Sequence, residues 1–363
     1  MRQQRGSVII IVLWTAVLLT VLVTAMASKV RLSAQTAVHN QDASIGWAQQ
    51  MAALNQAEAE LMLELMPRPI DEQLEQTDEG ELRTPAYRFN GQRLSLSYPL
   101  PENTVVRIYD HAGKINLNRI PRRNMQMLIE QRLGGLEADP EQVQDLLAAW
   151  TDWTDLNDLQ GLNGAEREYY ESLESAFVPR NNPELDTVEE ILHIRGFADL
   201  FEGVNLDAAF TVYGNTRTVN LNLATREAMQ LLPGMNDELI ENIIAYRELE
   251  DINNRAEIAE IVPFENLQEL SAWVGNNTST VYSVFVYPEL ELNEEQQQQQ
   301  SESSGQQPEE EFINPDPVTQ AYMEIVEVRS FNNLPRVYKV DPYGHLPDTA
   351  PARVLEEDLL FNR

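Results

Sequence analysis

The feature that most constrains this chain is an uninterrupted apolar segment near its start. Residues 7–27 contain no ionisable side chain and consist mostly of Val, Ile, Leu and Ala. A run of about 20 such residues lets an α-helix cross the roughly 30 Å hydrocarbon core of a bilayer. Arg2 and Arg5 precede the run, while Lys29 and Arg31 follow it. Since basic residues favour the cytoplasmic side, we expect a cytoplasmic leader with the rest of the chain beyond the membrane.

Three kinds of N-terminal segment fit this pattern. A cleaved secretory signal has a shorter apolar core of about 7 to 15 residues, and a plain membrane anchor needs only the apolar run. The third kind accounts for more residues, because the basic leader ends in Gly6 and the apolar helix begins at Ser7. This arrangement resembles the type IV pilins and pseudopilins. The resemblance implies cleavage after Gly6 by prepilin peptidase. Most members carry Glu as the fifth mature residue, whereas this chain has Ile11, and one pseudopilin type usually lacks that Glu.

The segment after the membrane run predicts more helix. Residues 28–66 are rich in Ala, Gln, Leu, Met and Glu, which are good helix formers. Pro67 and Pro69 then end the pattern, because proline cannot continue a helix. One continuous helix over 7–66 is the prediction, and two helices hinged near Gly46 are the alternative.

Several stretches predict β-strands of an antiparallel sheet with one solvated face. Apolar and polar residues alternate at 93–98, and the β-rich stretch 105–109 precedes a turn at 110–113. Residues 280–287 form a strong β run, and 322–328 with 336–340 predict a hairpin. Residues 288–320 are mainly Glu, Gln, Ser and Pro, which predicts a disordered excursion within the sheet.

Between the two groups of strands lies an internal repeat in a helical region. The motif I-N-L-N at 115–118 recurs as V-N-L-N at 219–222, and each copy is followed by R-x-x-M-Q-x-L. Pro121 and Thr225 occupy equivalent places and suit the start of a helix. We expect the Asn side chains to hold the turns through bonds to the backbone. The repeat indicates a duplicated helical hairpin.

Two further hairpins are predicted in the same region. The second repeat continues through Leu232-Pro233-Gly234-Met235 into a helix with an apolar stripe over 239–244. A third hairpin is predicted from Asp186, where Glu189 stands at capping-box spacing, with its turn at 194–196.

Helical hairpins with glycine turns can also bind the DNA backbone through turn amides and nearby basic residues. The charges here oppose that function. The stretch 226–260 holds three positive residues, Arg226, Arg247 and Arg255, against nine negative ones: Glu227, Asp237, Glu238, Glu241, Glu248, Glu250, Asp251, Glu257 and Glu260. The whole chain has a formal net charge of -32, which repels nucleic acid. A membrane-anchored periplasmic DNA-binding or uptake protein therefore remains only the alternative function.

An acidic, glycine-containing loop between the repeats is a candidate metal site. We select five oxygen-bearing residues as candidate ligands: Asp152, Asp155, Asn157, Asp158 and Glu166. Hard cations such as Ca²⁺ take six to eight oxygen ligands. The EF-hand pattern is not met, because its glycine and closing Glu are misplaced. A solvated acidic loop without metal is the alternative.

The sequence carries no pattern of a known catalytic site. The four histidines lie in unrelated contexts, and neither a nucleophile elbow, nor a phosphate-binding glycine loop, nor H-E-x-x-H occurs. We therefore expect a protein that is not an enzyme.

Taken together, these features resemble the K-type minor pseudopilins of the type II secretion system, the general secretion pathway protein K family. The resemblance rests on the R-G leader without a fifth-position Glu, the two N-L-N repeats, and D-W-x-D…N-G-A-E-x-x-Y-Y at 152–170. It covers roughly residues 1–287 and the 322–340 hairpin; the Gln-rich segment departs from it. It implies inner-membrane anchoring by a single span, a C-terminal bulk in the periplasm, assembly with I- and J-type and other pseudopilins at the pseudopilus tip, and calcium binding.

The predicted fold class is α+β: a long N-terminal transmembrane helix, a pilin-like antiparallel sheet, and a large inserted all-α domain of helical hairpins, similar to helix-hairpin-helix or SAM domains. The predicted boundaries are a leader at 1–6, a helix at 7–66 with its membrane part at 8–27, sheet at 67–112, helical domain at 113–279, sheet at 280–345 interrupted at 288–320, and a tail at 346–363.

Overall fold

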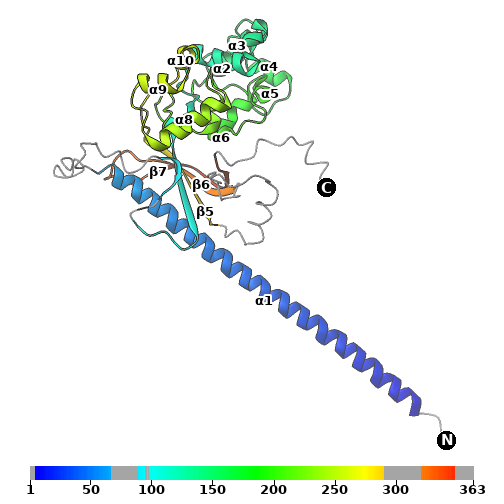
Figure 1. Ribbon diagram of the computed structural model, residues 1–363. Coiled ribbons are helices and arrows are strands. Elements are labelled where there is room, and N and C mark those ends of the chain that lie inside the picture. Colours follow the sequence, from blue (N-terminus) through cyan, green and yellow to red (C-terminus); the bar gives the residue numbers. More distant parts are fainter. Residues whose placement is uncertain (1–4, 67–88, 95, 97, 290–319, 348–363) are drawn as a thin grey trace, which may run out of the picture. The chain divides into compact units, whose positions relative to one another are not determined.

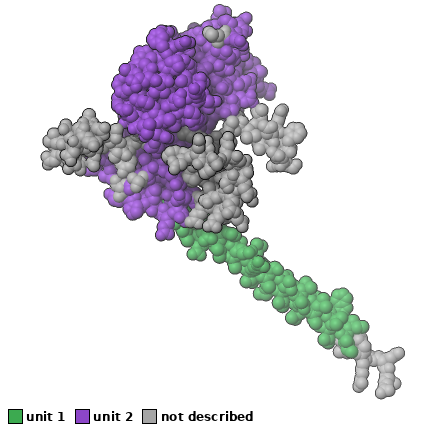
Figure 2. All heavy atoms as spheres, in the orientation of Figure 1, with its two compact units in different colours: residues 1–52 green, residues 53–363 purple. Residues whose placement is uncertain are grey.

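The computed structural model describes residues 5–66, 89–94, 96, 98–289 and 320–347. The chain divides into two compact units, residues 1–52 and 53–363, coloured green and purple in Figure 2. The predicted leader, the predicted excursion over 288–320 and the predicted tail lie largely outside the described residues.

The first long element is α1, Arg5–Glu64, which continues through Gly46 (Figure 1). The hinged alternative is therefore wrong. A Cβ built at Gly46 would meet nothing within 4 Å, so the glycine marks no close approach and no break. Within the described part of the chain, α1 is the one helix long and apolar enough to span a membrane, judged by length and composition. Its last turns, in the second unit, bury Ala53, Leu54, Ala57 and Leu61, the helical stripe that packs into that unit.

The second unit contains an antiparallel five-stranded sheet in the order β1-β2-β5-β6-β7. The strands are β1 Asn90–Arg93, β2 Thr104–Asp110, β5 Val281–Pro288, β6 Gln320–Glu327 and β7 Arg336–His345. Every residue of β5 except Pro288 is buried, as expected for the central strand of the sheet. The predicted hairpin appears as β6 and β7, which pair directly.

The strand predicted over 93–98 is wrong. The edge strand β1 ends at Arg93, and Leu94 and Leu96 lie in no strand. A Cβ at Gly91, which has φ of 91°, would lie 2.2 Å from the ring of Tyr109. The position of β1 beside β2 therefore depends on a close approach of the Gly91 backbone to the Tyr109 ring, which only glycine allows. Alternation of apolar and polar residues does not encode such an approach.

The helices are inserted between β2 and β5, which are neighbours in the sheet with Asp110 opposite Tyr282. They are α2 Arg122–Arg132, α3 Pro140–Trp153, α4 Arg167–Ser172, α5 Phe197–Leu200, α6 Leu206–Ala209, α7 Arg226–Gln230, α8 Asp237–Leu249, α9 Arg255–Ile261 and α10 Phe264–Leu270, with 3₁₀ turns at His111–Gly113, Gly135–Glu137 and Val188–His193. One apolar cluster lies at the centre of this insertion. The α+β fold class predicted from the sequence is confirmed.

A buried polar junction joins the insertion to the sheet. The Asp110 carboxylate accepts hydrogen bonds from the backbone N–H of Ala112 at 2.8 Å and of Ser279 at 3.1 Å, so it holds both ends of the insertion. Burial raises the pKa of Asp110 to about 7. The His111 ring lies 2.7 Å from the Thr211 hydroxyl and 2.8 Å from the Ser283 hydroxyl, and thus links the insertion to β5.

The duplication is visible in the backbone pairing. Ile115 of β3, Ile115–Asn116, pairs in parallel with Phe210 of β4, Phe210–Thr211. In the second copy the equivalent residue, Val219, forms a parallel bridge with Val274. Both copies then enter a helix at the predicted positions, with Pro121 and Thr225 as the N-cap residues of α2 and α7.

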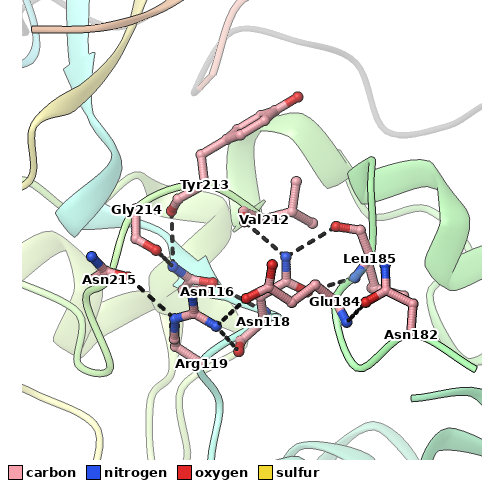
Figure 3. A network of polar contacts seen from close by, with 10 residues as sticks. All are labelled: Asn116, Asn118, Arg119, Asn182, Glu184, Leu185, Val212, Tyr213, Gly214 and Asn215. Carbon is pink, nitrogen blue, oxygen red and sulfur yellow. Dashed lines mark hydrogen bonds and ion pairs between the residues drawn. The ribbon is translucent and has the colours of Figure 1, made fainter. Parts of the chain in front are cut away.

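The second Asn of each repeat joins distant backbone segments. The Asn118 side-chain oxygen accepts a hydrogen bond from the Leu185 N–H at 2.8 Å. Its side-chain amide donates to the carbonyls of Leu185 and Val212 at 3.0 and 2.9 Å (Figure 3). Asn222 does the same with Ile252, receiving its N–H and donating to its carbonyl, both at 2.9 Å. The predicted bonds within the turns are also present, because Asn116 and Asn220 accept the N–H of Asn118 and Asn222 at 3.1 and 3.0 Å. The second Asn of each repeat adds bonds that reach across the domain.

The third hairpin differs from its prediction. Its first element is a 3₁₀ helix, Val188–His193, and the N-cap Thr187 makes no side-chain capping bond. Glu189 does not close a capping box, because its carboxylate bonds Lys339 of β7 at 2.8 Å. Glu190 bonds the Asp186 N–H instead, at 2.9 Å. A tertiary ion pair has replaced the local cap that the spacing suggested.

The paired Asn side chains give a direct test. Asn118→Ala and Asn222→Ala should each lower the free energy of unfolding by about 1–3 kcal/mol, because each leaves backbone groups without a partner. Urea unfolding of the purified chain measures this. Asn333→Ala is the matched control at an exposed position and should change stability by less than about 0.5 kcal/mol. Equal effects at all three positions would contradict the role given to Asn118 and Asn222.

Candidate metal site

The acidic loop brings together three of the five predicted ligands. Asp152 stands near the end of α3, Asp155 follows the helix, and Glu166 is the N-cap residue of α4. One carboxylate oxygen of each lies within 4.8 Å of the other two. Asp152 and Glu166 are only 4% and 3% exposed, so two of the three carboxylates are buried. Buried carboxylates this close together stay ionised only beside a positive partner and otherwise take up protons.

Two glycines make room for the Asp152 carboxylate. The Gly161 N–H donates to both of its oxygens at 3.2 Å. A Cβ on Gly164 would lie 1.8 Å from Oδ2, a distance that no side chain can tolerate. The loop therefore requires glycine at 164 for a steric reason and not only for its flexibility.

The other two predicted ligands make contacts with neighbouring residues. Asn157 supports Asp155, because its backbone N–H and its side-chain amide donate to the two Asp155 oxygens, both at 2.9 Å. Asp158 is 3.5 Å from the Arg167 guanidinium and is largely exposed. The Asn157 Oδ1 atom in turn accepts the Leu159 N–H at 2.9 Å.

Sequence reasoning missed Arg195, which fixes the far side of the loop. The motif 194–196 predicted only a turn, yet the Arg195 guanidinium donates to the carbonyls of Gly164 at 3.1 Å, Asp145 at 3.2 Å, and Asn163. Its backbone N–H also donates to the Tyr170 hydroxyl at 3.1 Å. No sequence signal distinguishes this arginine from the others, because its partners are backbone carbonyls.

The electrostatics of the cluster favour a bound cation. Burial raises the pKa of Asp152, and the neighbouring Asp155 adds to the shift. Burial likewise raises the pKa of Glu166, with further contributions from Asp152, Asp155 and Asp158. The Glu166 Oε1 atom is buried and has no hydrogen-bond partner. Because an unpartnered buried oxygen is costly, these donors fit a hard, oxygen-seeking ion such as Ca²⁺.

The candidate processing and position residues all fall on α1. Gly6, Ser7 and Ile11 lie in its first turns, and Ile11 is exposed. The Pro-Gly turn of the second repeat faces its own domain, because the Gly234 carbonyl accepts a bond from Asn266 of α10 at 2.5 Å. This packing and the acidic flanks do not favour the DNA-binding alternative.

Comparison with known proteins relates part of this chain to a protein family. Residues 113–201 match the family model described as Type II secretion system (T2SS), protein K. Among solved structures, the chain is similar to one described as the crystal structure of the GspK-GspI-GspJ complex from the enterotoxigenic Escherichia coli Type 2 Secretion System. That likeness has 12% sequence identity and a TM-score of 0.47, and it covers 85% of this chain and 98% of that chain. A search of curated proteins finds no match.

The described part of the chain thus combines an apolar N-terminal helix long enough to cross a membrane with an antiparallel sheet that carries a helical insertion. The segment that matches the protein K model, residues 113–201, includes Asn118, the acidic loop and Arg195. Over residues 113–201 this match agrees with the K-type minor pseudopilin family predicted from the sequence.

Proposed function

We propose that this chain is the minor pseudopilin at the tip of a type II secretion pseudopilus, where it assembles with I- and J-type pseudopilins to support protein export across the outer membrane. The observation that carries the proposal is the protein K match over 113–201, joined to an apolar N-terminal helix. The helix anchors the chain in the inner membrane with its C-terminal bulk in the periplasm. The role is structural, with no catalysis and no nucleic acid bound.

The tip position is supported by Ile11. In an ordinary pseudopilin the fifth-position carboxylate must pair with the amine of the subunit ahead, because an unpaired charge in an apolar setting is costly. A first subunit has no neighbour ahead, so an apolar Ile11 suits it. The helical insertion also adds bulk between β2 and β5 that would obstruct close repetition along a fibre.

Imaging or cross-linking of assembled pseudopili should accordingly find one copy of this chain per fibre, at an end. Ile11→Glu should be tolerated or mildly harmful to secretion and should not improve it. Ile11→Val serves as the matched apolar control. Copies repeated along the shaft would contradict the tip position.

Cleavage after Gly6 by prepilin peptidase is part of the proposal. A side chain at position 6 would obstruct approach to the peptide bond that is cut, so Gly6→Leu should leave a full-length precursor. Gly46→Leu is the control on the same helix, where an added Cβ meets nothing within 4 Å. Intact mass measures both, and a mature protein that starts anywhere but Ser7 would contradict this site.

Calcium is proposed as the occupant of the acidic loop, with carboxylates of Asp152, Asp155 and Glu166 as its protein ligands. The ion would add positive charge beside these carboxylates and would hold the end of α3 to the start of α4. Without it, the raised carboxyl pKa values mean that the folded chain binds protons more tightly than the unfolded chain. Stability should therefore fall as pH rises above the ordinary carboxyl range, and calcium should cancel that fall.

Chelation of the purified chain should lower its melting temperature, because a ligand that binds only the folded state adds about 2.7 kcal/mol at a hundredfold excess over Kd. Glu166→Gln should weaken the calcium response, whereas Glu168→Gln, an exposed residue of the same helix, should preserve it. If calorimetry detects no heat of calcium binding and chelation leaves the melting temperature unchanged, the loop is a solvated acidic segment without a calcium site.

A further inference from the structure

Arg195 contacts both helices beside the carboxylate cluster and the loop between them. Its guanidinium donates to the Asp145 carbonyl of α3 at 3.2 Å and to the loop carbonyls of Asn163 and Gly164, the latter at 3.1 Å. It also lies over the ring of Tyr169 of α4, 5.3 Å from the ring centroid. One side chain therefore joins the two helices to the loop that separates them.

The backbone that presents this side chain is itself fixed. Ile194 is 1% exposed and belongs to the apolar cluster at the centre of the insertion. The Arg195 N–H donates to the hydroxyl of Tyr170 at 3.1 Å. A guanidinium held at its base loses little further freedom when it binds the loop, so its bonds position the loop effectively.

One peptide group links Arg195 to the Asp152 carboxylate. The Gly164 carbonyl accepts hydrogen bonds from Arg195 at 3.1 Å and from the Gln160 amide at 2.9 Å, so both of its lone pairs are engaged. The N–H of the same peptide group belongs to Ala165 and donates to the Asp152 carboxylate. Because the carbonyl and the N–H of a planar trans peptide point in opposite directions, a fixed carbonyl aims the N–H. The positive donor also polarises the peptide and strengthens the bond from its N–H.

The charge of Arg195 has the opposite consequence for a bound cation. Burial raises the pKa of Asp152 and the Arg195 guanidinium opposes that shift, so the guanidinium lies within electrostatic reach of the cluster. A positive charge at that place repels a cation, and its removal alone would tighten cation binding. Position and charge therefore predict opposite effects of replacing Arg195.

We propose that Arg195 is a positioning residue of the cation site, which holds the Asp152 carboxylate in place by aiming the Ala165 N–H at it. The proposal rests on the calcium site proposed above. Positioning outweighs repulsion, so the loop binds calcium more tightly with Arg195 than without it.

Calcium titration by calorimetry tests this on the purified full-length chain in detergent, at a temperature where every variant is folded. Arg195→Gln should weaken calcium binding by about 10- to 100-fold, the usual effect of losing a group that orients a metal ligand. Arg195→Lys should weaken it as well, because an ammonium keeps the charge but lacks the planar fork that spans several carbonyls.

Arg132 is the matched control in the same insertion. Its guanidinium also donates to two backbone carbonyls, those of Leu200 at 2.9 Å and Glu202 at 3.3 Å. Arg132→Gln and Arg195→Gln should both lower the melting temperature without calcium, because each leaves carbonyls without a donor. Only Arg195→Gln should change the calcium affinity, which separates positioning from a purely structural role.

Gln160 gives a second test at an exposed position, where a substitution leaves the fold intact. Gln160→Ala removes the other donor to the Gly164 carbonyl and should weaken calcium binding by about threefold. Since both donors act on one carbonyl, its effect should not simply add to that of Arg195→Lys. This variant keeps the proposal testable if Arg195→Gln does not fold.

Two sets of results would overturn the role of Arg195 while leaving the calcium site in place. The first is tighter calcium binding by Arg195→Gln with no change in Arg195→Lys, since charge would then decide. The second is an unchanged affinity in the Arg195 and Gln160 variants, or an equal loss in Arg132→Gln. A parent chain that binds no calcium would overturn the calcium site and this role together.

Discussion

The Asp110 carboxylate is the contact on which the rest of the second unit depends. It receives the backbone N–H of Ala112, where the chain leaves the sheet, and of Ser279, where the chain returns. Because β2 and β5 are adjacent, both connections must meet at one strand end, and a single buried acceptor joins them. The same burial that raises the pKa of Asp110 to about 7 also shields these bonds from water. A large helical insertion can therefore lie between β2 and β5 without changing how these two strands pair.

The two Asn residues extend this order into the insertion. Asn118 and Asn222 each bind both backbone groups of one distant residue, Leu185 or Ile252, so each repeat is closed by the same device. In the first repeat this closure bounds the segment that carries the acidic loop. Arg195 then holds the loop backbone to α3, because its guanidinium donates to the loop carbonyls of Asn163 and Gly164 and to the Asp145 carbonyl of α3. The carboxylate cluster is thus positioned by amide and guanidinium groups that do not belong to it.

The repeat and the central strands were predictable because their signals are local. Residues 219–222 copy 115–118, and β5 is an unbroken β-rich run. The strand predicted over 93–98 failed because β1 is placed by the contact between Gly91 and Tyr109, which lie far apart in the sequence. Glu189 likewise lost its predicted cap to an ion pair with Lys339 across the unit.

The sequence by itself determined the apolar helix, the duplication, the strand-rich segments and the composition of the acidic loop. These features were predictable because their signals are local. The period of apolar residues, the positions of glycine and proline, and the residue types each depend on a few neighbouring residues. Only the tertiary structure decided that Asp152, Asp155 and Glu166 converge while Asp158 pairs with Arg167, and that the leucines of the loop are exposed. The reason is that Arg195 joins the loop to α3 through the carbonyls of Gly164 and Asp145, which lie 31 and 50 positions away from it in the sequence.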